Sequence, residues 1–169
     1  MYRVSDLLSK PLITLADAHY QGTVGNIYFD AKLRRGKYIE LFDEEETEQA
    51  FVGLNQVNFG VDAAVVKHDG VLTYSWNTAL DGLAQNPINS LAFNPEGKSL
   101  GRVTDVLMEG TTVTGFEVDG VVMPTETLLS YSKNMLIFND TGKPIKLAKP
   151  KKRVPPPSAG TATVAVTTP

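Results

Sequence analysis

The stretch EGKSLGRVTDVLME at residues 96–109 has an earlier counterpart, QGTVGNIYFD, at residues 21–30. Each stretch contains a Gly, a short gap that ends in Leu or a β-branched residue, a second Gly, one variable residue, and then Ile or Val. Two occurrences of one pattern predict two copies of one small unit. The alternative is chance, because short strands with glycine turns resemble one another easily.

The two halves of the chain also match downstream of these stretches. At an offset of 72 residues, the apolar run 63–66 meets the run 135–138, and Gly70 meets Gly142. Upstream, a different offset places Gly25 opposite Gly101, and a four-residue change of loop length accounts for the difference. We therefore expect a repeat that covers most of residues 5–142.

Alternating apolar and polar residues predict several short strands. In KYIELF (37–42), Ile39 and Leu41 are expected to face the core and Glu40 to face water. FEVD (116–119) shows the same alternation, and MLIF (135–138) is expected to be a short buried strand. The segment 125–131 predicts one helical turn, with Thr125 as its cap.

Neither half contains the helical stretches that crossovers in a parallel sheet require. Short strands joined by tight turns favour antiparallel sheets, and a unit of this size hides its edges most easily by curling. The predicted fold class is all-β: two small tandem antiparallel β-barrels and a disordered C-terminal tail. We assign residues 1–80 and 81–147 to the two repeats and 148–169 to the tail.

The second half resembles a PRC-barrel domain. The pattern is a Gly-x-x-x-Gly-x-Val-x-Asp strand, then GFEV, VVMP, a short helical turn and an apolar closing strand. The matching positions are Gly97, Gly101, Val103, Asp105, Phe116, Val118, Pro124 and Leu128. In the first half Gly22, Gly25, Ile27 and Asp30 approximate the opening. The fold occurs in a photosynthetic reaction-centre subunit and in a ribosome-maturation factor, and the resemblance implies an adaptor rather than an enzyme.

Charge divides the chain into an acidic body and a basic tail. The net charge is −3, but all 19 acidic residues lie before Gly142, so that residues 1–142 carry a net charge of −9. The tail holds six basic residues, then prolines, then Thr, Ala and Val. Its composition cannot build a core. The cluster expected to contact nucleic acid or an anionic membrane is Lys149, Lys151, Lys152 and Arg153.

No residue is assigned to catalysis, to a metal or to a cofactor. The chain has no cysteine, which excludes disulfides and thiolate metal sites. Asp30 and Asp105 end their predicted strands and are expected to bond turn amides rather than to act as acid and base. His19 is expected at the surface and His68 in a turn. No phosphate-binding glycine motif is present.

Two further features have a structural and a functional interpretation. The acidic run that contains Asp43, Glu44, Glu45, Glu46 and Glu48 is expected to be a solvated loop, since adjacent carboxylates without a shaped loop do not converge on one cation. Trp76 follows Tyr74 near the junction of the two copies. It is expected to pack between them, although an exposed aromatic pair would suit a partner.

The sequence therefore predicts a cytoplasmic, non-enzymatic adaptor that binds a protein partner, with a connection to RNA or ribosome metabolism. One alternative is a nucleic-acid- or membrane-associated protein tethered by its basic tail. Another is an enzyme or small-molecule binder, which would show a pocket between the barrels with convergent polar groups. No transmembrane segment is predicted, because no apolar run approaches the ~20 residues that a membrane-spanning helix needs.

Overall fold

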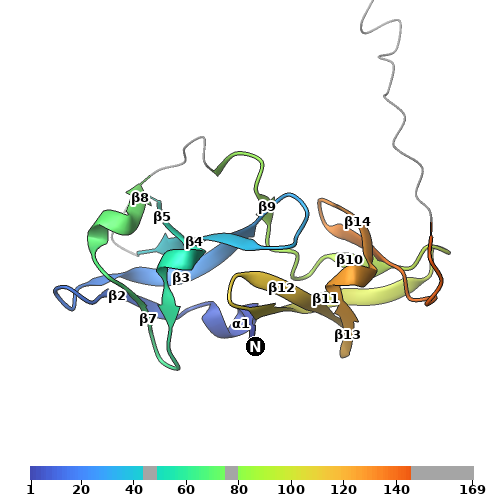
Figure 1. Ribbon diagram of the computed structural model, residues 1–169, viewed down its shortest axis with the longest axis horizontal. Coiled ribbons are helices and arrows are strands. Elements are labelled where there is room, and N and C mark those ends of the chain that lie inside the picture. Colours follow the sequence, from blue (N-terminus) through green and yellow to red (C-terminus); the bar gives the residue numbers. More distant parts are fainter. Residues whose placement is uncertain (44–48, 75–79, 146–169) are drawn as a thin grey trace, which may run out of the picture.

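The computed structural model describes residues 1–43, 49–74 and 80–145 of the chain. These residues form mostly strands, arranged as two curled half-barrel sheets that lie side by side along the long axis of the molecule (Figure 1). The predicted all-β fold class is confirmed. The domain limits at residues 80 and 147 remain a prediction.

The elements of the first half are short, and one long strand organises them. They are β1 (Tyr2–Arg3), α1 (Val4–Leu7), β2 (Pro11–Thr14), β3 (Tyr20–Phe29), β4 (Gly36–Phe42), β5 (Ala50–Gly53), the 3-10 turn η1 (Leu54–Gln56), β6 (Asn58–Phe59), β7 (Ala64–Val66), η2 (Asp69–Val71) and β8 (Leu72–Tyr74).

The second half repeats this order. Its elements are β9 (Ala84–Gln85), β10 (Leu91–Phe93), β11 (Ser99–Glu109), β12 (Thr112–Val118), β13 (Val121–Pro124), η4 (Thr125–Thr127), β14 (Leu128–Ser132) and β15 (Met135–Phe138).

The two sheets share one order over six strands, and the first adds β8 at its end. The first runs β6-β7-β2-β3-β4-β5-β8 and the second runs β14-β15-β10-β11-β12-β13. Most neighbouring strands are antiparallel, as expected, but β2 pairs with β7 and β10 with β15 in parallel. No crossover helix is needed for these pairs, because the chain travels around the curled sheet between the two strands.

The two halves exchange short strands. From the N-terminus, β1 pairs with β11 in the second sheet, and from the second half, β9 pairs with β3 in the first sheet. The tips of the two long hairpins also meet. The Gly36 amide donates to the Thr111 carbonyl over 2.8 Å, and the Val113 amide donates to the Arg34 carbonyl over 2.9 Å. One continuous apolar core therefore contains residues of both halves.

Strand register confirms the downstream match and corrects the upstream one. Leu12 lies opposite Gly22 and Ala64, while Ala92 lies opposite Gly101 and Leu136. Ala64 and Leu136 are thus equivalent, as the offset of 72 predicts. The counterpart of Gly101 in the first half is therefore Gly22, not Gly25. Both glycines have a left-handed backbone, with φ +121° and +112°. That shared conformation fixes the equivalence.

Two local predictions are wrong. Glu40 does not face water: its side chain is buried, with Ile39 and Leu41 buried beside it. The Glu40 carboxylate is paired rather than solvated, because its Oε2 accepts a hydrogen bond from Gln49 Nε2 over 2.8 Å. Thr125 does not cap a helical turn. It begins a 3-10 turn whose cap is Pro124, and its hydroxyl donates to the Val113 carbonyl over 2.8 Å.

Candidate interaction surface

Apolar side chains gather on the outer face of the second sheet. Along β15, Leu136 and Phe138 are fully buried, whereas Met135 and Ile137 are 49% and 36% exposed. Leu91 lies opposite Met135, and Phe93 lies opposite Ile137. The outward side chains of two neighbouring strands are therefore all apolar. The prediction of a wholly buried strand at 135–138 is corrected, because only alternate residues point into the core.

A groove of about 430 Å³ lies over this face. It is lined by Phe93, Asn94, Pro95, Gly97, Ser130, Tyr131, Ser132, Met135 and Ile137. Asn94 shapes its rim: the buried Oδ1 accepts hydrogen bonds from the amides of Glu96 (3.0 Å) and Lys98 (2.9 Å). The turn after β10 is thereby held in place, and the groove suits an apolar side chain.

The end strand β13 also exposes apolar residues. Val121 is 60% exposed and Val122 is 50% exposed. Among the described residues, β13 pairs with β12 on one side and has no strand on the other. This edge is joined to the face just described through η4 and β14.

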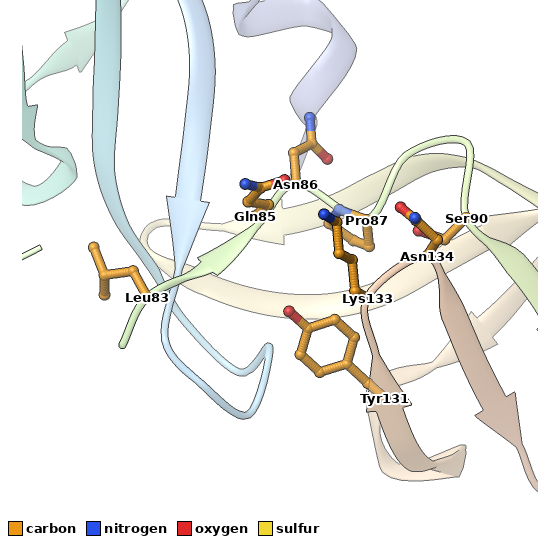
Figure 2. A pocket seen from close by; sticks show the side chains of 8 residues that line it. All are labelled: Leu83, Gln85, Asn86, Pro87, Ser90, Tyr131, Lys133 and Asn134. Atoms are coloured by element: carbon orange, nitrogen blue, oxygen red, sulfur yellow. The ribbon is translucent and has the colours of Figure 1, made fainter. Parts of the chain in front are cut away.

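A smaller pocket of about 240 Å³ lies where the two sheets meet (Figure 2). Its walls are Leu83, Gln85, Asn86, Pro87, Ser90, Tyr131, Lys133 and Asn134. Figure 2 shows β9 and its flanking loop on one side and Tyr131 and Lys133, from the β14–β15 hairpin, on the other. Burial raises the pKa of the Tyr131 hydroxyl. The walls carry one ammonium and several amide and hydroxyl groups, and no carboxylate, so the pocket suits a small polar or anionic group.

The first half has a pocket in the equivalent place, with different chemistry. It measures about 520 Å³ and is lined by Tyr2, Asp6, Leu7, Lys10, Phe59, Gly60 and Val61. Phe59 lies opposite Ala64, and Tyr131 lies opposite Leu136. Because Ala64 and Leu136 are equivalent, Phe59 and Tyr131 are equivalent too. The Lys10 ammonium here donates to the Gly60 carbonyl over 2.6 Å. The first-half pocket thus contains a carboxylate and a lysine that is already bonded, whereas the junction pocket contains a lysine and no carboxylate.

The two aspartates singled out in the sequence have structural roles. As predicted, Asp30 bonds turn amides: its Oδ1 accepts from the amides of Arg34 (2.7 Å) and Arg35 (3.3 Å). Asp105 does not end its strand, however. It lies inside β11, where the bulge beside Thr104 turns it to face the N-terminal segment.

Asp105 fastens the N-terminus of the chain to the second sheet. Its carboxylate accepts from the Ser5 amide (3.1 Å) and the Ser5 hydroxyl, and lies 3.8 Å from the Arg3 guanidinium. Arg3 also pairs with Glu117, and this ion pair lowers the pKa of the Glu117 carboxyl. The cluster is fully paired and holds α1 between the sheets.

The histidines fit their predicted structural roles. His19 is exposed, and the His68 Nδ1 accepts from the Gly70 amide (3.1 Å) at the start of η2.

Several residues singled out in the sequence lie outside the described residues. They are Trp76, the acidic residues 44–48 and the predicted contact residues Lys149, Lys151, Lys152 and Arg153. Within residues 1–43, 49–74 and 80–145, no group of three or more His, Asp or Glu side chains is placed to hold a metal ion. No described helix is long and apolar enough to cross a membrane.

The apolar surface residues are those that sequence reasoning missed. Met135 and Ile137 alternate with Leu136 and Phe138, but all four are apolar, so the pattern carries no sign of which pair faces out. Comparisons with known proteins do not add to this assignment, since neither a protein-family model nor a curated protein matches the chain.

Proposed function

We propose that the protein is a non-enzymatic adaptor that binds a protein partner through its second sheet. The supporting observation is the outer face of β10 and β15, where Phe93, Met135 and Ile137 surround the 430 Å³ groove. Removing apolar surface from water contributes about 25 cal/mol per Å², so such a face favours a protein partner with apolar side chains.

The PRC-barrel resemblance supports the same proposal. The second half shows the motif with eight matching positions, and the family is one of adaptors. The net charge of −9 on residues 1–142 favours a basic partner, such as a ribosomal protein. A connection to RNA or ribosome metabolism follows from the resemblance and from this charge.

The test is affinity capture with the full-length chain from nuclease-treated lysate. The double variant Met135→Ser/Ile137→Ser removes the apolar face. Val61→Ser is the matched control, because Val61 is 90% exposed and lies in the β6–β7 turn of the first half. We expect one protein, identified by mass spectrometry, to be captured by the wild type and Val61→Ser and lost with the double variant. Equal capture by all three chains contradicts the proposal.

The same experiment separates the tail-based alternative. Binding through phosphate contacts falls steeply as salt rises and disappears with nuclease. A partner held by the apolar face instead survives both treatments. Loss of all captured protein on nuclease treatment would favour nucleic-acid binding through residues 143–169.

A second candidate function, small-molecule binding, is favoured by the junction pocket. Lys133, Tyr131 and three carboxamides line it without a carboxylate. A thermal-shift screen of small carboxylates and phosphates against the wild type and Lys133→Gln tests this directly. A stabilisation that Lys133→Gln abolishes supports the candidate; no stabilisation by any compound removes it.

A further inference from the structure

Strands β5 and β13 hold equivalent places in the two sheets. Each is the return strand of a hairpin. Phe51 of β5 lies opposite Glu40 of β4, and Val122 of β13 lies opposite Glu117 of β12. One residue closer to the hairpin turn, Ala50 lies opposite Leu41 and Val121 opposite Val118. The register therefore makes Phe51 the counterpart of Val122.

The two strands differ on their far side. Along β5, a further antiparallel strand, β8, pairs Tyr74 with Ala50, Thr73 with Phe51, and Leu72 with Val52. Along β13, no strand occupies that place among the described residues. Phe51 is fully buried while Val122 is half exposed. The first sheet shows what completes this edge: an antiparallel strand.

The backbone of Val122 is oriented to bond such a strand. Asp119 and Gly120 connect β12 to β13 with positive φ values of +47° and +82°, as a two-residue type I′ turn requires. The residues that flank such a turn, Val118 and Val121, form a hydrogen-bonded pair. Bonding alternates along the strand, so the N–H and C=O of Val122 point away from β12. The backbone nitrogen of Pro124, two residues further on, also points away from β12. Its lack of an N–H therefore removes no hydrogen bond between β12 and β13.

The chain that follows β15 does not fill this place within the described residues. After β7 the chain passes Gly70 and enters β8 at Leu72. The corresponding positions after β15 are Gly142 and Pro144, and residues 141–145 form no strand. Within residues 1–43, 49–74 and 80–145, the first sheet is thus completed by its own chain, and the second is not.

We propose that β13 takes up an extended segment of a protein partner, antiparallel and in the place that β8 occupies on β5. This inference rests on the proposed adaptor function and names how the partner is held. An apolar partner residue lies opposite Met123, as Leu72 lies opposite Val52. Basic residues flank it, because Asp119 and Glu126 border the edge and the body carries a net charge of −9. The same charge disfavours a second copy of this chain.

The probe for this site is a synthetic peptide that carries β8 and the two residues before it, residues 70–74 (GVLTY), with two lysines at each end. It is titrated into the full-length protein while the backbone amide of each residue is followed by NMR and hydrogen exchange. We expect saturable binding below about 1 mM and slower exchange of the Val122 amide.

Two variants separate the backbone bond from the side chain. Val122→Pro removes the outward N–H without touching the bonds to β12, and Val122→Thr keeps both the N–H and a β-branched side chain. We expect Val122→Pro to weaken peptide binding on the order of tenfold and Val122→Thr to leave it nearly unchanged. Equal binding by both variants, or no saturable binding, overturns the proposal.

Other occupants of the edge give different results. Slow exchange of the Val122 amide without peptide, at all protein concentrations, would assign the edge to this chain's own tail. Slow exchange that appears only at high protein concentration would assign it to a second copy. Both results overturn the proposal. If the edge variants bind the captured partner as the wild type does, but Met135→Ser/Ile137→Ser does not, the adaptor function stands and strand addition fails.

Discussion

Phe51 and Val122 occupy equivalent places in the two sheets, each opposite a glutamate of the preceding strand, yet Phe51 is fully buried and Val122 is half exposed. Strand β8 lies beside the first of them and has no described counterpart beside the second. Among the described residues, the same fold thus has one completed and one open edge.

Substitutions at these two positions should lower the free energy of unfolding by different amounts. Phe51→Ala removes a buried ring and should lower the free energy of unfolding by about 3–5 kcal/mol. Val122→Ala removes a half-exposed side chain and should cost less than about 1 kcal/mol. Urea unfolding followed by fluorescence or circular dichroism measures both. Similar losses would show that β13 is covered in solution.

Gly36 should be intolerant of a side chain because it lies where the two halves meet. A Cβ at this position would come within 2.5 Å of Leu54 Cδ2 and 2.8 Å of Met108 Cε, one from each half. We expect Gly36→Ala to cost about 1–3 kcal/mol in urea unfolding.

Gly25→Ala is the matched control for Gly36→Ala. A Cβ there meets the ring of Phe42, which is 55% exposed and free to turn into solvent. Gly25→Ala should therefore lower the free energy of unfolding by less than Gly36→Ala does. If Gly25→Ala is the more destabilising change, the close contact between the halves at Gly36 is not the constraint that the structure indicates.

Asp105 should hold the N-terminal segment on the second sheet. Asp105→Ala leaves the Ser5 amide without its acceptor and should cost about 1–3 kcal/mol. It should also speed hydrogen exchange of that amide. Asn26→Ala is the control, since Asn26 holds the equivalent place in β3. Its Oδ1 accepts from the Ile27 amide over 2.9 Å, as Asp105 Oδ1 does from the Val106 amide, and its side chain also bonds Tyr28 of the same strand. Unchanged exchange at Ser5 in Asp105→Ala would contradict this role.

Glu40 should make the folded protein less stable as the pH rises. Burial raises the pKa of the Glu40 carboxyl above its usual value of 4.5, although a hydrogen bond from Tyr28 opposes the shift. The folded state therefore binds this proton more tightly than the unfolded state does. The contribution to stability is present at low pH and is lost as the pH rises above the unfolded pKa.

The Glu40→Gln variant isolates this effect. Gln is neutral and can still accept a hydrogen bond from Gln49, whose Nε2 lies 2.8 Å from Glu40 Oε2. The stability of Glu40→Gln relative to the wild type should increase between about pH 4 and 7. Urea unfolding at several pH values measures it. A relative stability that stays constant or falls over this range would contradict the raised pKa.

The sequence predicted the fold class and the downstream repeat because both depend on local patterns. Short apolar runs and glycine turns indicate strands, and the match of 63–66 with 135–138 is visible in the residues alone. The glycine register was wrong because the sequence shows how many glycines there are, not which have a positive φ. Gly22 has one and Gly25 does not.

The exchanged strands and the candidate surface could not be predicted. Strands β1 and β9 contain two residues each, too few to show a period. The open edge of β13 was equally hidden, because β8 pairs with β5 while no described strand pairs with the far side of β13. A sequence pattern reports the chemistry of a strand but not what lies beside it.

Site-specific photo-crosslinking most directly tests whether the second sheet holds a protein partner. A photoreactive residue is placed at position 122, at position 135, or at position 61 as the control, in the full-length chain. Crosslinking in nuclease-treated lysate should join one and the same protein to positions 122 and 135, and not to position 61. If no protein is crosslinked at positions 122 and 135, or if position 61 is crosslinked to the same proteins, the adaptor function is contradicted.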